Sequence, residues 1–199
     1  MSEKIINPSC VRNQQPIFDA LSPWLSGNGP LLELASGTGQ HGVHICGQRP
    51  NLQWQLTEHP SQVALSHPWQ QEAQLCNLLP CIPLDITQIT WPVPSNTYQY
   101  AYCANLLHFV SADDVSAVFK GISLTLKKTG LFFCYGPINE NGFTSDGNKN
   151  LDEWLKHDVN PQAGIKELIL LQECADRHGL RFKERLNLPA NNVILVFEK

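Results

Sequence analysis

Residues 30–42 read Pro30-Leu-Leu-Glu33-Leu-Ala-Ser-Gly37-Thr-Gly39-Gln-His-Gly42. The apolar run 30–35 predicts a short buried strand, and the segment after the glycines predicts a helix that ends near residue 48. Gly37 and Gly39 permit positive φ angles and let a ligand come close to the backbone. The stretch is therefore typical of a strand, a glycine turn and a helix whose first amide groups are free to face a ligand.

The segments on either side of this unit alternate between strand and helix patterns. Strands are expected at residues 30–35, 52–57, 81–84, 98–104, 131–136, 181–186 and 193–198. Helices are expected at residues 14–25, 40–48, 61–76, 111–128, 151–158 and 164–178. This alternation predicts an α/β, Rossmann-like, doubly wound fold with a mostly parallel seven-stranded sheet. The last two strands, around the turn 188–192, are expected to form a C-terminal antiparallel hairpin.

The length of 199 residues predicts a single domain over residues 1–199, because two full domains would be cramped. Residues 1–28 are expected to form an N-terminal arm and helix, with the arm irregular through residue 13. Residues 137–150 are rich in Asn and Gly and predict a long mobile loop.

The charge and hydropathy patterns argue against some partners. The 14 basic and 18 acidic residues give a net charge of −4, which disfavours a nucleic-acid binder that neutralises phosphates. No membrane span is expected, because Pro92 and Pro94 interrupt the uncharged stretch 86–112. Residues 1–8 also lack the apolar core of a signal peptide.

The seven cysteines form no C-x-x-C pair and predict reduced thiols in a cytoplasmic protein. A zinc site would need paired ligands that meet in space. The nearest pairs, Cys76 with Cys81 and His41 with His44, lie far apart in sequence, so no metal site is expected.

Two acidic residues follow the strands next to the glycine turn. Glu58 lies 21 residues beyond Gly37, after the second strand, and Asp85 ends the third. The carboxyl ends of parallel strands meet at one edge of the sheet, where ligands bind. A carboxylate at the position of Glu58 can accept hydrogen bonds from two ribose hydroxyls.

A glycine turn of this kind fits either a dinucleotide or S-adenosylmethionine. Glu33 lies four residues before Gly37 and would put a carboxylate inside the pocket. It would repel a pyrophosphate and suit the ammonium group of a methionine. The terminal hairpin, and a chain too short for a separate substrate domain, also favour S-adenosylmethionine.

Residues 33–41 resemble motif I of the class I S-adenosylmethionine-dependent methyltransferases. The chain is most similar to a small methyltransferase-like family of unassigned substrate, formerly a domain of unknown function, and the similarity runs nearly end to end. The segments that carry it are Arg12-Asn13 with Pro16-Ile17, Trp54-Gln55 with Glu58, Leu84-Asp85-Ile86-Thr87, Asn105-Leu-Leu-His108, Tyr135-Gly136-Pro137, Phe143-Thr-Ser-Asp-Gly-Asn148 and Leu188-Pro-Ala-Asn-Asn192. One departure is that similar sequences carry Asp where this chain has Glu58.

The resemblance implies a role for each matching residue. Gly37 and Gly39 would pass beneath the cofactor, Glu33 would face its methionyl part through water, Glu58 would bind the ribose and Asp85 the adenine amino group. Asn105 would line the methyl-transfer site and contact the cofactor, and Arg12 would meet the cofactor carboxylate or form a surface ion pair.

The implied activity is methyl transfer to a small-molecule acceptor. His108, which follows the fourth strand, is the best candidate for a base, although a structural role in packing with Phe109 is an alternative. Asn105 and Tyr135 are the other candidate catalytic residues. The acceptor is expected between Arg12 and Asn13, the end of the fourth strand, and the loop residues 143–148.

Two other functions remain open. The chain has no N-P-P-Y type motif at Asn105, so an adenosylmethionine-binding sensor or subunit without catalysis is the alternative to an enzyme. A small NAD-dependent reductase is a third possibility. It is disfavoured because no tyrosine is followed four residues later by lysine.

Overall fold

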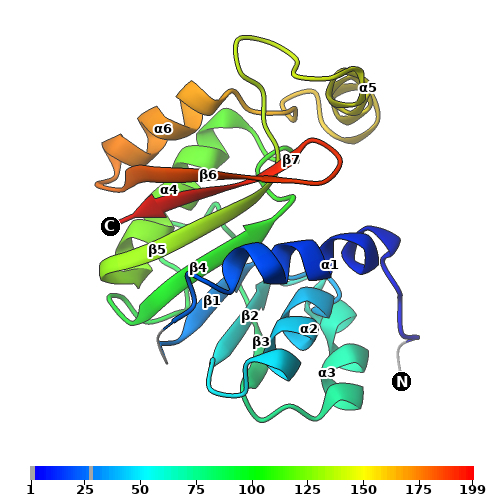
Figure 1. The fold of residues 1–199 in the computed structure, drawn as a ribbon, viewed down its shortest axis with the longest axis vertical. Coiled ribbons are helices and arrows are strands. Elements are labelled where there is room, and N and C mark those ends of the chain that lie inside the picture. Colours follow the sequence, from blue (N-terminus) through cyan, green and yellow to red (C-terminus); the bar gives the residue numbers. More distant parts are fainter. Residues whose placement is uncertain (1–2, 27–28) are drawn as a thin grey trace.

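The computed structural model describes residues 3–26 and 29–199, and Figure 1 shows a sheet with helices packed around it. Seven strands form one sheet in the order β3-β2-β1-β4-β5-β7-β6. In chain order the strands are β1 (Leu31–Leu34), β2 (Trp54–Glu58), β3 (Leu78–Pro83), β4 (Tyr98–Ala104), β5 (Leu126–Pro137), β6 (Arg181–Leu188) and β7 (Asn192–Glu198). The first five strands pair in parallel, and β7 is antiparallel to both β5 and β6. The predicted fold class and its terminal hairpin are therefore confirmed.

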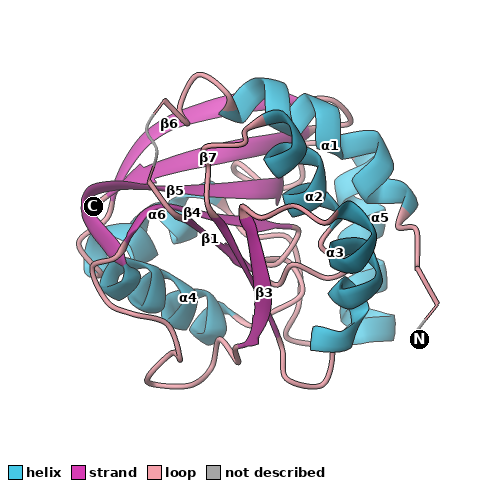
Figure 2. Ribbon diagram, turned by 90° about the horizontal axis from the view of Figure 1, so that it is seen from below, coloured by secondary structure: helices cyan, strands magenta, loops and turns pink. Residues whose placement is uncertain are grey.

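Helices cover both faces of this sheet (Figure 2). The helices are α1 (Pro8–Leu21), α2 (Gln40–Gln48), α3 (His67–Ala73), α4 (Ala112–Thr125), α5 (Asp146–Trp154) and α6 (Leu168–Arg177), with a short 3₁₀ turn η1 (Val63–Ser66) before α3 and a π turn η2 (Leu155–Val159) after α5. Helices α1 and α2 pack on one face, and α4 and α6 pack on the other. Every helix within 3–26 and 29–199 is too short or too polar to cross a bilayer.

The core consists of two hydrophobic clusters, one on each face of the sheet. Neighbouring residues of a strand point to opposite faces, so Leu31 and Trp54 pack toward α1 and α2, whereas Leu32 and Leu34 pack toward α4 and α6. All four side chains are fully buried. A strand buried on both faces is usually apolar throughout, which explains the three leucines of β1. Glu33 is the exception, and its buried carboxyl group accepts a hydrogen bond from the Trp54 indole N–H.

The N-terminal helix begins earlier than expected. Asn7 caps it by accepting hydrogen bonds from the N–H groups of Ser9 (2.9 Å) and Cys10 (3.4 Å), and Pro8 occupies the first turn. Pro16, expected near the helix start, lies inside α1. The prediction of an irregular arm through residue 13 is therefore wrong, and Arg12 and Asn13 are helical.

Other element boundaries also differ from the predictions. Strand β3 begins at Leu78 rather than at residue 81, and β5 begins at Leu126, directly after α4, so that helix ends earlier than predicted. Helix α5 begins at Asp146, because the Ser145 side chain accepts a hydrogen bond from the Asn148 N–H (3.1 Å) and caps it. The predicted loop 137–150 is therefore shorter and covers residues 138–145.

Residues 3–7 form a strap that runs from α3 to the start of α2. Lys4 forms an ion pair with Glu72 (2.7 Å) and lies 3.8 Å from the ring centroid of Trp69. The indole N–H of Trp69 donates to the carbonyl of residue 5 (2.8 Å), and the Asn7 N–H donates to Gln40 Oε1 (2.7 Å). The start of α1 is thereby fixed beside the glycine turn, at the carboxyl ends of the strands.

The two edge strands of the sheet differ in composition. Strand β3 contains Pro80 and Pro83. Strand β6 exposes the charged side chains of Arg181, Lys183 and Glu184.

Gly121, in the interior of α4, provides a test of the packing on the α4 face. A methyl group there would overlap the indole ring of Trp91, which is itself buried. Gly121→Ala should therefore lower the free energy of unfolding by about 1–3 kcal/mol, the usual range for overpacking, although alanine is the better helix former. Gly47→Ala in α2 is the control, because a Cβ there meets nothing within 4 Å and should leave stability equal or higher. Urea unfolding of the two variants checks this, and equal stability of Gly121→Ala would contradict the packing.

Candidate functional site

The turn between β1 and α2 is built from left-handed backbone. Ala35, Gly37 and Gly39 have φ angles of 52°, 55° and 76°. A Cβ added at Gly37 would meet nothing within 4 Å, whereas one at Gly39 would lie 3.3 Å from Leu56 and 3.4 Å from Ser66. Gly37 thus leaves space for a ligand, and Gly39 lets the turn pack on β2.

Glu58 fixes this turn from the end of β2. The Gly37 N–H donates to its Oε2 (2.6 Å), and the His59 N–H donates to its Oε1 (2.7 Å). The side chain is only 7 % exposed. Because a carboxylate oxygen can accept more than one hydrogen bond, both oxygens keep capacity for a ligand.

A cavity of about 370 Å³ opens beside Glu58 at the carboxyl ends of the strands. Its wall combines apolar and polar side chains, which are Ala35, Leu84, Ile86, Leu106, Val110, Glu58, His59, Asp85, Thr87 and Asp114. No lysine or arginine is among these lining residues. The structure thus brings the predicted Glu58 and Asp85 to one cavity of negative charge.

Asp85 is held by its neighbour Thr87. Its Oδ1 accepts hydrogen bonds from the Thr87 N–H (2.9 Å) and hydroxyl (2.7 Å). These two bonds lower the pKa of the Asp85 carboxyl. Asp85 is therefore ionised at neutral pH, with its second oxygen available to a hydrogen-bond donor in the cavity.

Glu33 lies beneath the turn rather than in the wall of the cavity. It shares the α1–α2 face of the sheet with Leu31, is 2 % exposed, and its Oε2 accepts from the Trp54 indole N–H (2.7 Å). Burial raises the pKa of the Glu33 carboxyl to about 8, although hydrogen bonds from Trp54 and Ser36 oppose this. Its expected contact with the methionyl part of a cofactor remains a prediction.

The candidate catalytic residues Asn105 and His108 meet at the ends of β4 and β5. The Asn105 N–H donates to the Tyr135 carbonyl (2.8 Å), and Asn105 has a φ of 58°. Asn105 Oδ1 and His108 Nδ1 both lie 3.7 Å from the position that a Cβ on Gly136 would take. Both side chains therefore lie beside Gly136 at this edge of the sheet.

His108 is buried, with 6 % of its surface exposed, and does not line the 370 Å³ cavity. It borders a separate void of about 10 Å³ that it shares with Gly136 and Lys166, with room for about one water. Burial, and the charge of Lys166, lower the pKa of His108 to about 4. Its imidazole is neutral at pH 7 and a weak base.

Tyr135 and Arg12 lie on the α1 side of the same edge. Burial raises the pKa of the Tyr135 phenol to about 12, and the nearby positive charge of Arg12 partly opposes the rise. The Arg12 guanidinium is exposed on α1 and donates to Ser9 Oγ (2.9 Å). Within residues 3–26 and 29–199 it has no carboxylate in ion-pair range. Arg12 is also absent from the cavity wall.

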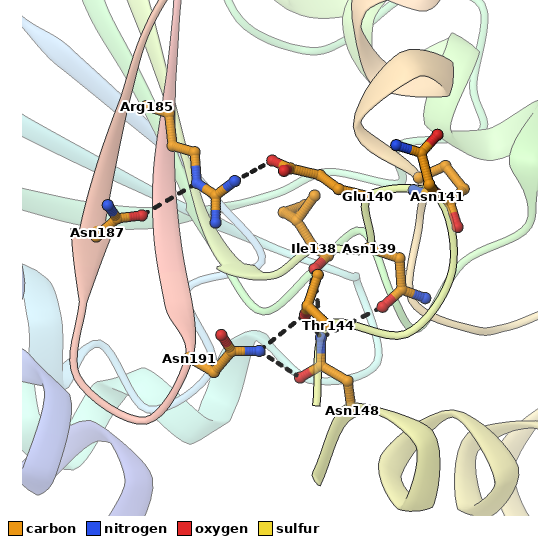
Figure 3. Close-up of polar contacts among 10 residues, drawn as sticks. Ile138, Asn139, Glu140, Asn141, Thr144, Asn148, Arg185, Asn187 and Asn191 are labelled. Carbon is orange, nitrogen blue, oxygen red and sulfur yellow. Dashed lines mark hydrogen bonds and ion pairs between the residues drawn. The ribbon is translucent and has the colours of Figure 1, made fainter. Parts of the chain in front are cut away.

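The loop 138–145 is held by amide side chains (Figure 3). Asn148 Nδ2 donates to the carbonyl of Ile138 (3.3 Å) and to Thr144 Oγ1 (3.0 Å), and Asn191 Nδ2, from the β6–β7 turn, also donates to Thr144 Oγ1 (2.8 Å). An Arg185–Glu140 ion pair links the loop to β6. The loop expected to be mobile is thus fastened to α5 and to the terminal hairpin.

Several residues at this edge were not predicted. Those that line the cavity include His59, Thr87, Leu106, Val110 and Asp114, and those that fasten the loop are Asn191 and Arg185. Asn148, which also fastens the loop, lies within the range 143–148 that was expected to border the acceptor. The cavity residues follow the strand ends in sequence, and that position was the available signal. The contacts of Asn191 and Arg185 join segments more than 40 residues apart, and no local pattern reveals them.

Residues 4–199 match the family described as "Protein of unknown function (DUF938)". The structure is similar to mitomycin 7-O-methyltransferase (TM-score 0.80, 16 % identity, 94 % of this chain and 54 % of that one). It is also similar to an O-methyltransferase family protein from Burkholderia thailandensis, with a TM-score of 0.78 and 14 % identity over 96 % of this chain and 57 % of that one. Human N-acetylserotonin methyltransferase, solved in complex with SAM, gives a TM-score of 0.78 at 12 % identity, and the match covers 96 % of this chain and 52 % of that one. The chain spans about half the length of these proteins. Its fold is the class I methyltransferase fold that motif I predicts.

Proposed function

Because the chain belongs to the DUF938 family of unknown function and has the class I methyltransferase fold, we propose that it binds S-adenosylmethionine and transfers the methyl group to a small-molecule acceptor. The observation that carries the proposal is the position of Glu58. Its carboxylate accepts a hydrogen bond from the glycine turn and lines the 370 Å³ cavity.

The cavity residues fit the adenosine part of this molecule. Glu58 would accept from the ribose hydroxyls, since each of its oxygens accepts only one hydrogen bond from the protein. Asp85 would accept from the adenine amino group through its second oxygen. Leu84 and Leu106 supply apolar surface for the ring.

The same cavity argues against a dinucleotide. A pyrophosphate on a glycine turn needs free backbone N–H groups, but the Gly37 N–H is already bonded to Glu58. Glu58, Asp85 and Asp114 put three carboxylates in the wall, and no lysine or arginine is among the residues that line it. A phosphate group there would meet repulsion without compensation.

The sulfonium methyl group is already electrophilic, so the protein mainly has to place the acceptor behind it. Alignment alone supplies an effective concentration of about 10⁵–10⁸ M in well-oriented systems. Asn105, next to the cavity residue Leu106 in the chain, is suited to this positioning. This proposal needs no metal and no base of high strength.

Calorimetric titration tests the ligand. S-adenosylmethionine and S-adenosylhomocysteine are expected to bind one per chain, and NADH is expected not to bind. Transfer of label from methyl-labelled S-adenosylmethionine to small molecules of a cell extract tests catalysis. Binding without transfer would favour a sensor or subunit, and binding of NADH alone would contradict the proposal.

A further inference from the structure

Arg12, which lies where the acceptor is expected, has no acidic partner within residues 3–26 and 29–199. Arg12 lies near Tyr135, at the end of β5, and donates only to the neutral hydroxyl of Ser9. Two other basic side chains at this edge are engaged. Arg185 pairs with Glu140, and Lys166 Nζ donates to the carbonyls of Val110 (2.7 Å) and Gly164 (2.8 Å). Arg12 is thus free to receive an anionic group from solution.

The groups near the ends of β4 and β5 are poorly suited to remove a proton. His108 is buried and lies near the positive charge of Lys166. Burial, together with this charge, lowers the pKa of its imidazole to about 4. The pKa of Tyr135 is raised to about 12, so its phenol keeps its proton at neutral pH. Glu33 is enclosed beneath the turn by Trp54 and Ser36 and is out of reach of an acceptor. An acceptor that must lose a proton would find no suitable base among these residues.

Both observations favour an acceptor that arrives without a proton on its nucleophilic atom. We propose, on the basis of the function proposed above, that the acceptor is a carboxylic acid whose carboxylate is held by Arg12 and methylated on oxygen. One carboxylate oxygen accepts hydrogen bonds from the guanidinium, and the other forms the bond to the methyl carbon. The bond between that carbon and sulfur breaks, its electron pair stays on sulfur, and no proton moves. The products are a methyl ester and a neutral thioether.

Other nucleophiles fit the edge less well. Carboxylic acids have pKa values near 4 and are ionised at neutral pH, whereas phenols and most thiols are protonated and would need a base. A phosphate carries more charge than one guanidinium neutralises, and it would approach the acidic cavity formed by Glu58, Asp85 and Asp114. A planar carboxylate also matches the fork of an arginine.

The chemical stability of the product tests the proposal directly. The protein is incubated with methyl-labelled S-adenosylmethionine and the small-molecule fraction of a cell extract, and the labelled product is then treated with alkali. A methyl ester of a carboxylic acid releases its label as volatile methanol, whereas methyl groups transferred to phenols, amines, thiols or phosphate monoesters resist this treatment. Volatile label is the expected result. Label that is transferred but stable to alkali would overturn the carboxylate assignment alone, and absence of transfer would overturn the transfer reaction and this inference together.

Variants of Arg12 separate its role from cofactor binding. Arg12→Gln should lower the rate of label transfer to the small-molecule fraction about 10- to 100-fold, the range for loss of a charge-assisted hydrogen bond, while calorimetry shows unchanged affinity for S-adenosylhomocysteine. Arg12→Lys should recover part of the loss, because it restores the charge without the fork. The matched control is Arg181→Gln, which removes an exposed arginine at the opposite end of β6. An equal loss of S-adenosylhomocysteine affinity in Arg12→Gln would assign Arg12 to the cofactor carboxylate and overturn the inference.

Discussion

Glu58→Ala is expected to weaken the binding of S-adenosylhomocysteine by about 100-fold or more. A charged acceptor of ribose hydrogen bonds contributes about 1.5–3 kcal/mol, which corresponds to roughly 10- to 100-fold in affinity. The substitution also releases the N–H groups of Gly37 and His59, which Glu58 holds at 2.6 and 2.7 Å. The turn then loses a constraint that the ligand-binding conformation needs, so the effect should lie at the upper end of this range or above it.

The control for this prediction is Glu58→Asp, which keeps the charge and shortens the side chain by one methylene. It should retain most of the affinity, whereas Glu58→Ala should not. Isothermal calorimetry gives the affinities, and circular dichroism checks that both variants fold. Unchanged affinity in a folded Glu58→Ala protein would show that the cofactor does not use this carboxylate.

In the natural protein, the free energy of unfolding is expected to fall as the pH rises toward 8. Glu33→Gln is expected to remove the part of this fall that comes from the Glu33 carboxyl group. Burial raises the pKa of Glu33 from 4.5 to about 8, so the folded protein holds a proton that the unfolded chain has released. The stabilising effect of that proton is complete below pH 4.5 and is lost as the pH rises through 8. The slope is about 1.4 kcal/mol of unfolding free energy per pH unit. Glutamine resembles the neutral acid and still offers an oxygen to Trp54.

The pH window for this experiment is 7.5 to 8.5. The lowered pKa values of His41 and His108, both about 4, act with the opposite sign, because they cost stability as the pH falls through 6.5. Above pH 7.5 roughly nine-tenths or more of the unfolded histidines are neutral as well, so their effect on the slope is small there. Urea unfolding between pH 7.5 and 8.5 should give a free energy that falls more steeply for the natural protein than for Glu33→Gln. Glu153→Gln, an exposed site on α5, should keep the steeper slope. Equal slopes for the natural protein and Glu33→Gln would mean that Glu33 is ionised in the folded protein.

The fold could be predicted because its signals are local and periodic. The apolar run before the glycines, the alternation of strands and helices, and the two adjacent C-terminal strands predict a mostly parallel sheet of seven strands with a terminal hairpin. The start of α1 was mispredicted because two prolines compete for the first helical turn. Pro16 fits that turn by its type, but Asn7 caps the helix and Pro8 follows it directly. Ser145 is a similar cap signal, and the Asn- and Gly-rich segment around it is also typical of a loop.

Site residues could be predicted only where they stand at the carboxyl ends of strands, because the topology alone then brings them together. Glu58 and Asp85 follow neighbouring parallel strands, so topology alone brings them to one cavity. The bond between Gly37 and Glu58 and the burial of His108 depend on side-chain packing that no periodicity encodes. The position of Glu33 illustrates the same point. Its spacing before the glycine turn suggests a group inside the pocket, but its place on the α1–α2 face puts it beneath the turn.

The two edge strands determine how copies of this protein can associate. An open sheet exposes unpaired N–H and C=O groups at its edges, and these can recruit strands from other molecules. In β3, Pro80 and Pro83 have no N–H to donate, so a continuous ladder cannot form there. In β6, the exposed charges of Arg181, Lys183 and Glu184 would have to be desolvated against a like-charged strand of a second copy. Both edges thus disfavour sheet extension, and we expect a dimer of the folded protein to use its helices or loops.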